Sequence, residues 1–380
     1  MTVLLDHLPI KWNIEEQIDN VHYFGDPPVS PDSLKEIREL RESFGEELLV
    51  LGHHYQRDEI IQFADKIEDS LALSQFATNS DKVKTILFLG IHIMAETADM
   101  LTPRETAVIL PDLNAGCTMG DYAPRSAIEQ CWADLSAIIN IEKITPISYV
   151  NATAAVKAFS GLHNGCTCTS ANTAAIMSWA LEQTGKVLFL PDRNLGRNTA
   201  FSLGIPDDKV ILWDPSLPLG GNSIQNIRDA KVIAWKGFCS IHEHFTTKHA
   251  EFLRKEHPGI KILVHPEVGP EIFRAADDFG STSQIIDKIN NAEPGSVWAV
   301  GTEYHMVNRL AESVRDKGIK VLNISPFASL CAPMFRINAE AVLASLRALK
   351  NGEYRYRVQV DDDTREMASI ALKRMFGITG

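Results

Sequence analysis

Three of the six cysteines occupy equivalent places in the sequence, and together they could bind iron. Cys117, Cys239 and Cys331 each lie a few residues beyond a short apolar segment that is typical of a buried strand. No two cysteines have the C-x-x-C spacing of a zinc ribbon or a ferredoxin. Three thiolates that meet at one place would leave one iron of a [4Fe-4S] cluster without a protein ligand. An open iron is a Lewis acid, which favours hydro-lyase or condensation chemistry over electron transfer.

An internal repeat gives a reason why three distant cysteines could meet. Each of three units begins with an apolar strand that ends on polar residues, at 48–55, 147–151 and 262–267. After a turn and a helical stretch come a second strand (85–90, 186–191, 297–301) and a third (107–110, 231–235, 320–323). Apolar strands separated by helical segments are typical of small parallel sheets covered on both faces. The sequence therefore predicts an α/β fold of three similar α/β/α domains with approximate threefold symmetry around a central active site.

The repeat also sets the expected domain boundaries. Residues 35–117 together with 337–380 should form the first domain, residues 118–238 the second and residues 239–336 the third. Residues 1–34 are expected to be a loosely packed N-terminal extension, after which Ser33 caps a helix.

The polar ends of the first strands provide candidate catalytic groups. Ligands of parallel sheets bind beyond the carboxyl ends of the strands, and the three cysteines also lie there. Histidine and carboxylate pairs suit proton transfer near neutral pH. The residues concerned are His53, Tyr55, Tyr149, Asn151, His265 and Glu267. The spacing leaves open an alternative, in which three tandem domains never bring their cysteines together and each thiol is a small buried hydrophobic group.

Three hydroxyl side chains stand where helices are expected to begin. Ser70, Ser170 and Thr282 follow the first strands of their units. Each could simply cap its own helix. Helix N-termini also bind phosphate and carboxylate, so three converging helix starts would suit a substrate with several negative charges.

Composition excludes several classes of protein. The formal charge of −12 argues against a nucleic-acid partner, and no apolar run approaches the length of a membrane span. The first 20 residues lack the apolar region of a signal peptide, and six sparse cysteines indicate a reducing compartment, so a cytoplasmic protein is expected. His242-Glu243-His244 lacks the spacing of a helical zinc motif, which disfavours a zinc hydrolase.

Many short motifs, in the right order, resemble the quinolinate synthase family from about residue 35 to the C-terminus. They are Gly52-His-His-Tyr-Gln56, Asp69-Ser-Leu71, Met94-Ala-Glu96, Pro111-Asp-Leu-Asn-Ala-Gly-Cys117, Tyr149-Val-Asn151, Cys168-Thr-Ser-Ala-Asn172, Pro191-Asp-Arg-Asn-Leu-Gly196, Cys239-Ser-Ile-His242, His265-Pro-Glu267, Gly280-Ser-Thr282, Gly301-Thr-Glu303 and Cys331-Ala-Pro-Met334. The chain departs from the family pattern at Val268, where a cysteine is usual, and at Glu68, where a glycine is usual.

The resemblance implies a reaction and a set of roles. Iminoaspartate and dihydroxyacetone phosphate would condense to quinolinate for NAD biosynthesis, with L-aspartate oxidase as the supplier of unstable iminoaspartate. Cys117, Cys239 and Cys331 would hold a [4Fe-4S] cluster with one open iron. The substrate-binding residues would be His53, Tyr55, Ser70, Tyr149, Asn151, Ser170, His265, Glu267 and Thr282. Glu267 is the expected principal acid/base, with His265, Tyr55 and His53 as further catalytic groups. The alternatives are another iron–sulfur hydro-lyase acting on a small dicarboxylate and a non-catalytic iron–sulfur sensor.

Overall fold

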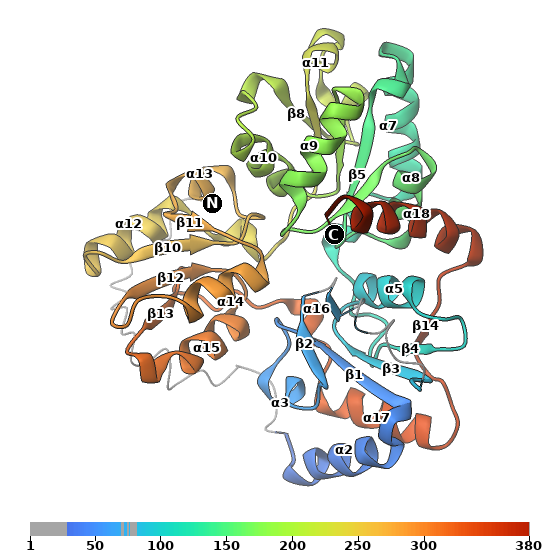
Figure 1. Ribbon diagram of the computed structural model, residues 1–380, viewed down its shortest axis with the longest axis vertical. Coiled ribbons are helices and arrows are strands. Elements are labelled where there is room, and N and C mark those ends of the chain that lie inside the picture. The colour runs from blue at the N-terminus through green and yellow to red at the C-terminus, as the bar shows by residue number, and fades with distance from the viewer. Residues whose placement is uncertain (1–28, 70–71, 74–75, 77–81, 380) are drawn as a thin grey trace.

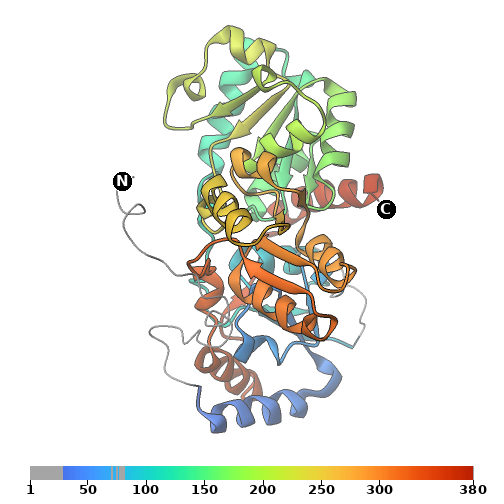
Figure 2. The ribbon, with the colours of Figure 1, turned by 90° about the vertical axis from the view of Figure 1, so that its left-hand side faces the viewer.

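Three lobes surround a common centre in the computed structural model, which describes residues 29–69, 72–73, 76 and 82–379 (Figure 1). Each lobe contains one sheet with helices on its faces. The view turned by 90° shows the third domain in front, below the second (Figure 2). No helix in the described ranges is long and apolar enough to cross a membrane.

The three sheets share one order of four parallel strands. The orders are β2-β1-β3-β4, β6-β5-β7-β9 and β11-β10-β12-β13, and the first strand of each predicted unit is an inner strand in all three. The first sheet adds β14, antiparallel to β4, and the second adds β8, parallel to β9. This repetition confirms the predicted fold class. The short edge strands β2, β6 and β11 were not predicted.

The elements of the first domain come from both ends of the chain. They are α2 (Pro31–Phe44), β1 (Leu48–His53), α3 (Asp58–Ile61), β2 (Lys66–Glu68), β3 (Thr85–Leu89), α5 (His92–Leu101), β4 (Ala107–Ile109), α16 (Ala332–Phe335), α17 (Ala339–Lys350) and β14 (Arg357–Val358), with the 3-10 turn η1 (Gly45–Glu47). Strands β1 and β3 are buried along their whole lengths, because helices cover both faces of the sheet.

In the second domain, one continuous stretch of chain, residues 118–235, forms the sheet and helices that cover it. Its elements are α6 (Thr118–Asp121), α7 (Arg125–Ile138), β5 (Thr145–Tyr149), α8 (Ala154–Leu162), β6 (Cys166–Cys168), α9 (Thr173–Thr184), β7 (Val187–Leu190), α10 (Arg193–Ser202), β8 (Val210–Trp213), α11 (Ile224–Asp229) and β9 (Val232–Trp235), with 3-10 turns η2 (Ile141–Lys143), η3 (Asp207–Lys209) and η4 (Pro218–Gly221).

The third domain is continuous in the chain. Its elements are α12 (Thr247–Glu256), β10 (Lys261–Val264), α13 (Pro270–Ala275), β11 (Asp278–Phe279), α14 (Thr282–Asn290), β12 (Val297–Gly301), α15 (Tyr304–Ser313) and β13 (Lys320–Asn323), with 3-10 turns η5 (His242–His244) and η6 (Arg315–Lys317).

The C-terminal segment divides between two domains, which corrects the assignment of residues 337–380 to the first domain. Helix α17 packs on α2 and β14 extends the first sheet, as expected. Helix α18 (Asp362–Thr379) packs instead on α8 and β6 of the second domain. Gly161 allows this close approach, because a Cβ there would lie 1.8 Å from the carbonyl oxygen of Met367.

The first described helix begins earlier than predicted. Helix α2 starts at Pro31, and the Ser30 side chain accepts a hydrogen bond from the backbone N–H of Asp32 at 3.2 Å. Ser33 therefore lies inside the helix, where its hydroxyl donates to Glu340 at 3.2 Å. The boundary at residue 34 was wrong because proline is favoured in the first helical turn, directly after the cap.

Candidate active site at the junction of three domains

The first strand of each domain ends in the same tight turn. The turns span residues 53–56, 149–152 and 265–268, and in each the N–H of the fourth residue donates to the carbonyl of the first. These bonds run from Gln56 to His53 (2.9 Å), from Ala152 to Tyr149 (3.0 Å) and from Val268 to His265 (3.1 Å). The turn places its first and third side chains at the carboxyl end of the sheet.

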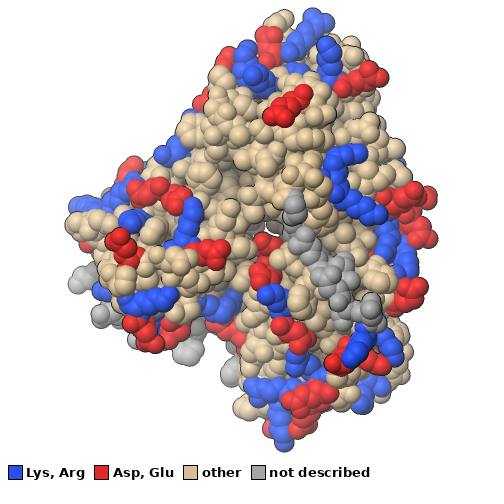
Figure 3. Space-filling view, viewed as in Figure 1, with Lys and Arg blue, Asp and Glu red and all other residues tan. Residues whose placement is uncertain are grey.

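All six of these side chains line one pocket of about 370 Å³, part of it open to solvent. The space-filling view shows a hollow where the lobes meet, with charged side chains mostly around the periphery (Figure 3). The lining residues are His53, Tyr55, Asp69, Tyr149, Val150, Asn151, Thr169, Ser170, His265, Glu267 and Thr282. The structure therefore unites the polar strand ends that the repeat predicted would meet.

Glu267 is the most enclosed acid of this pocket. Its Oε2 lies 2.7 Å from Nδ1 of His242 and 3.5 Å from Nδ1 of His265. The two imidazole rings stack with centroids 4.5 Å apart. Burial raises the pKa of Glu267, but the interactions with His265, His242 and Tyr149 outweigh burial and lower the pKa to about 2. Burial, followed by His242, lowers the pKa of His265 to about 3. At neutral pH the carboxylate is therefore ionised and His265 is neutral.

A chain of hydrogen bonds joins the first and third domains beside Glu267. The Tyr55 hydroxyl lies 2.7 Å from Oγ1 of Thr302, which lies 3.1 Å from Nε2 of His242. Burial raises the pKa of Tyr55, so its phenol keeps its proton. His53 accepts the backbone N–H of Tyr55 on Nδ1 at 3.1 Å, and burial lowers its pKa. Neutral His53 therefore carries its proton on Nε2.

Sequence reasoning missed His242 and Thr302 as members of the site. His242 was considered only as part of a zinc motif, although it also ends the Cys239-Ser-Ile-His242 motif. Thr302 directly follows β12 at the carboxyl edge of the third sheet, which was a usable signal.

The second domain contributes hydrogen-bonding groups to the pocket. Asn151 donates from Nδ2 to the Tyr149 hydroxyl at 3.1 Å. Burial, then the charge of Glu267, raises the pKa of Tyr149. Thr169 and Ser170 line the pocket just after β6. Ser170 does not begin a helix, because α9 starts at Thr173. Ser170 therefore lies in the pocket wall, and the expectation that it begins a helix was wrong.

The predictions for Thr282 and Ser70 have different outcomes. Thr282 is the first residue of α14, but Ser281 is the cap, in a capping box with Gln284. Thr282 is therefore not the capping residue and lies in the pocket wall. Ser70 lies outside the described residues. Its neighbour Asp69 lines the pocket and accepts a hydrogen bond from Ser283 at 3.0 Å.

The three predicted ligand cysteines lie close enough to influence one another. Burial, followed by Glu267, Cys117 and, more weakly, Cys331, raises the pKa of Cys239. Burial raises the pKa of Cys117 to about 11 and also raises that of Cys331. A metal that binds here must therefore displace thiol protons.

Backbone N–H groups point at each of these sulfurs. Cys117 and Cys331 immediately precede α6 and α16, and Cys239 precedes η5. The donors are Met119 and Gly120 for Cys117, His242 for Cys239 and Met334 for Cys331. Such hydrogen bonds stabilise thiolate ligands and tune cluster potential, so the three cysteines fit an iron–sulfur group. Ligand atoms of Cys239, His242 and Glu267 also lie within 4.8 Å of one another, a further possible metal site.

The other three cysteines lie in hydrophobic cores. Cys131 on α7 is 1% exposed, and Cys166 and Cys168 on β6 are fully buried. Burial raises the pKa of all three thiols. These side chains pack as small apolar groups.

Fold and site together define an α/β protein in which a candidate active site lies where three repeated domains meet. The family described as quinolinate synthetase A protein matches residues 35–377. Quinolinate synthases of Listeria innocua and Bacillus cereus are each 46% identical to the chain, over 92% and 90% of its length and 94% and 92% of theirs. The quinolinate synthase of Rhodopirellula baltica is 44% identical over 90% of both chains. The chain belongs to the quinolinate synthase family.

Proposed function

We propose that this chain condenses iminoaspartate with dihydroxyacetone phosphate to quinolinate, releasing phosphate and two waters. The observation that carries the proposal is the set of three equivalent turns, which place the family's polar motifs around one pocket beside three thiols. The atoms of the two substrates equal those of quinolinate, phosphoric acid and two waters, so the reaction needs no oxidant or reductant.

We infer that Cys117, Cys239 and Cys331 hold a [4Fe-4S] cluster. One thiol beyond the third predicted strand of each repeat (β4, β9 and β13) and a backbone donor at each sulfur support this assignment. When bound, the cluster supplies an open iron that polarises a hydroxyl or carbonyl oxygen and so assists loss of water. The chain's own side chains then have to remove protons and hold the substrates.

Glu267 is the proposed principal acid/base, and its environment makes it a proton acceptor at the start of the reaction. The carboxylate is ionised because its pKa is lowered to about 2. Oε2 contacts His242, whereas Oε1 is buried without a hydrogen-bond partner in the described part of the chain. Oε1 is therefore the oxygen that would accept a carbon-bound proton from the substrate. Nδ1 of His242, 2.7 Å from Oε2, holds the carboxylate in place.

Tyr55 and His53 are proposed as proton donors to the substrate. Tyr55 keeps its phenolic proton, and Thr302 connects it to His242. His53 presents an Nε2–H, since its Nδ1 accepts the N–H of Tyr55. Both groups suit a carbonyl or hydroxyl oxygen that gains negative charge.

The remaining pocket residues are proposed to bind the anionic ends of the substrates. Tyr149, Asn151, Ser170 and Thr282 supply hydroxyl and amide donors around the pocket. Ser70 belongs to the same proposed set through its motif. Neutral donors bind carboxylate and phosphate without an ion pair that would compete with charges formed during the reaction.

The chemistry of iminoaspartate implies a supplier, because this imine hydrolyses in water. We therefore propose L-aspartate oxidase as the preceding enzyme. Free cysteines and an oxygen-sensitive cluster also favour a reducing compartment, so we place the reaction in the cytoplasm.

One anaerobic assay separates this function from its alternatives. Reconstituted protein is mixed with dihydroxyacetone phosphate and iminoaspartate generated in the same vessel from L-aspartate. Formation of quinolinate, measured by chromatography, supports the proposal. Binding of both compounds without product would favour a sensor. Dehydration of a hydroxydicarboxylate without quinolinate would favour another hydro-lyase.

A further inference from the structure

The outer side of the third-domain turn is held by a helix of the second domain. Asn198 on α10 donates both hydrogens of its side-chain amide, to the carbonyl of Pro266 at 2.8 Å and to that of Val268 at 2.7 Å. Asn194, one helical turn earlier, donates to the carbonyl of Glu267 at 3.2 Å. Three successive carbonyls of the turn are thus bound from the neighbouring domain, while the Glu267 side chain faces the pocket.

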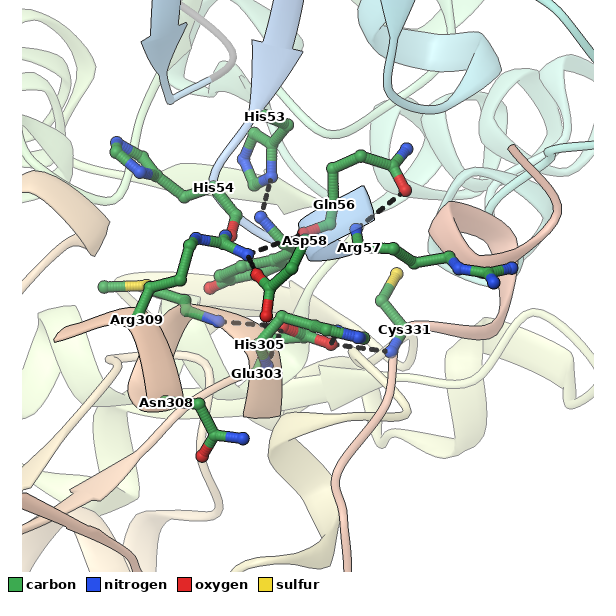
Figure 4. A network of polar contacts seen from close by, with 12 residues as sticks. His53, His54, Gln56, Arg57, Asp58, Glu303, His305, Asn308, Arg309 and Cys331 are labelled. Carbon is green, nitrogen blue, oxygen red and sulfur yellow. Dashed lines mark hydrogen bonds and ion pairs between the residues drawn. The ribbon is translucent and has the colours of Figure 1, made fainter. Parts of the chain in front are cut away.

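The first-domain turn is held in the same way by the third domain. Arg309 on α15 donates to the carbonyl of Gln56 at 2.9 Å and also to that of His54 (Figure 4). These are the second and fourth residues of the turn, the same two positions that Asn198 binds in the third domain. Asp58 pairs with the Arg309 guanidinium and fixes its direction.

The second-domain turn receives a related contact from the first domain. Glu96 on α5 accepts the backbone N–H of Ala154 at 2.9 Å, two residues after the turn. Here the neighbouring helix supplies an acceptor in place of a donor. Lys157 of the second domain itself donates to the carbonyl of Ala152, the fourth residue of the turn.

The three contacts form a closed cycle. Helices α5, α10 and α15 each follow the third of the four shared parallel strands in chain order, β3, β7 and β12. Helices α10 and α15 reach the turn of the next domain, and α5 reaches the residue two positions after it. The first domain holds the turn of the second, the second holds that of the third, and the third holds that of the first. We propose that Glu96, Asn198 and Arg309 are positioning residues that keep each turn in catalytic register only while the neighbouring domain is in place.

This inference rests on the proposed function, because the held turns carry the proposed catalytic groups. A displacement of about 1 Å at a reacting group can cost about 100-fold in rate. We call these three positioning residues the clamps. Since each clamp binds backbone and not substrate, its loss should lower turnover without changing the cysteines that bind the cluster. The cycle also means that a shift of one domain displaces a catalytic turn on its neighbour.

Amide hydrogen exchange tests the cycle without relying on activity. In the cluster-loaded protein, the N–H groups of Gln56, Ala152 and Val268 report the three turns. Asn198→Ala should speed exchange at Val268 roughly 10-fold or more, and Arg309→Met should do the same at Gln56. Glu96→Gln should act mainly at Ala154. In each variant the other two turns should stay within about twofold of the parent, and turnover should fall about 10- to 100-fold with normal cluster absorbance.

Two matched substitutions serve as controls. Arg315→Met removes an exposed arginine paired with Glu312, and Asn291→Ala removes an amide that bonds Asp287 within its own domain. Neither should change exchange at the three turns. If Arg309→Met fails to fold, Arg309→Lys, which keeps one donor, should give a smaller increase at Gln56. Increases confined to the mutated domain, or equal in all three turns, would overturn the proposal. A parent protein that makes no quinolinate would refute the proposed function. The exchange pattern alone would then test whether the three clamps hold the turns.

Discussion

Two parts of the pocket wall share one backbone turn but present different side chains. The turns 53–56 and 265–268 begin with histidine, and each histidine Nδ1 accepts the N–H of the third residue, at 3.1 and 3.4 Å. The turn 149–152 begins with Tyr149, whose hydroxyl bonds the Asn151 side chain instead. Repetition thus supplied three equal frames, and their different side chains divide what we propose to be a proton-transfer side, in the first and third domains, from a proposed binding side in the second.

The electrostatics follow the same division. On the proton-transfer side, Glu267 is held ionised beside two histidines, and burial keeps His53 neutral. On the binding side, the turn itself offers a phenol and an amide, and Thr169 and Ser170 add hydroxyls. Groups that change charge are therefore concentrated in the first and third domains.

The largest effect is expected from the three cysteines that lie beyond the third predicted strand of each repeat. Changing Cys117, Cys239 or Cys331 to Ser should abolish the brown absorbance near ~400 nm or reduce it severely, because thiolates are the proposed cluster ligands. The iron and sulfide content of each purified variant measures the amount of bound cluster independently of absorbance.

The buried cysteines provide the matched controls for that experiment. Cys131→Ala, Cys166→Ala and Cys168→Ala each remove a thiol from a hydrophobic core. Their cluster content should remain near that of the parent, although their stability should fall. Loss of the cluster in Cys168→Ala with retention in Cys239→Ser would contradict a shared site.

The next effect concerns the proton-transfer side. Glu267→Gln keeps the size of the side chain but removes the group that accepts a proton, so turnover should fall ~10²–10⁴-fold. KM and cluster content should change little. Steady-state kinetics on the anaerobic protein measures both constants, and near-normal turnover would move the acid/base assignment to His53, Tyr55 or His265.

Smaller losses are expected at two hydroxyls of the pocket wall, Ser170 in the second domain and Thr282 in the third. Ser170→Ala and Thr282→Ala each remove a hydroxyl that we propose to bind a charged oxygen, which corresponds to roughly 10- to 150-fold in affinity. Titration with a dicarboxylate inhibitor measures this loss, and kcat should change less than KM. Ser136→Ala on the exposed face of α7 is the control, since its hydroxyl bonds only Ala133. A fall in melting temperature without a change in affinity would indicate purely structural roles.

The periodicity of the sequence predicted the features that depend on local sequence. It failed for features that depend on contacts between residues far apart in the chain. Apolar strands with polar ends identified the sheets, the six turn residues and three cysteines beyond the third strands. Helix α18 was misplaced because its partner surface, around Gly161, is formed only in the folded second domain. His242 and the clamp residue Asn198 have no distinctive spacing, since their roles come from contacts with residues distant in the sequence, Glu267 and Pro266.

The smallest effect is expected at the outer position of a single turn, that is, at a side chain that does not face the pocket. His54 lies between His53 and Tyr55 but does not line the pocket, and its side chain points away from His53 (Figure 4). Burial lowers the pKa of His54 from 6.5 to about 4. Between these pH values the unfolded chain binds a proton that the folded protein does not. The contribution of His54 to stability is therefore complete above pH 6.5 and is lost as the pH falls toward 4.

Replacing His54 should remove this part of the acid sensitivity. From pH 7.5 to pH 5.0 the melting temperature of His54→Gln should fall about 1–2 °C less than that of the parent. Turnover at pH 7.5 should stay within about twofold, because only the backbone of this residue is held by Arg309. The exposed His244, changed to Gln, should leave the pH dependence of melting unaltered. An equal fall of the melting temperature in the parent and in His54→Gln protein would show that the His54 side chain is solvated like that of His244. Burial in this turn would then be limited to the side chains that face the pocket.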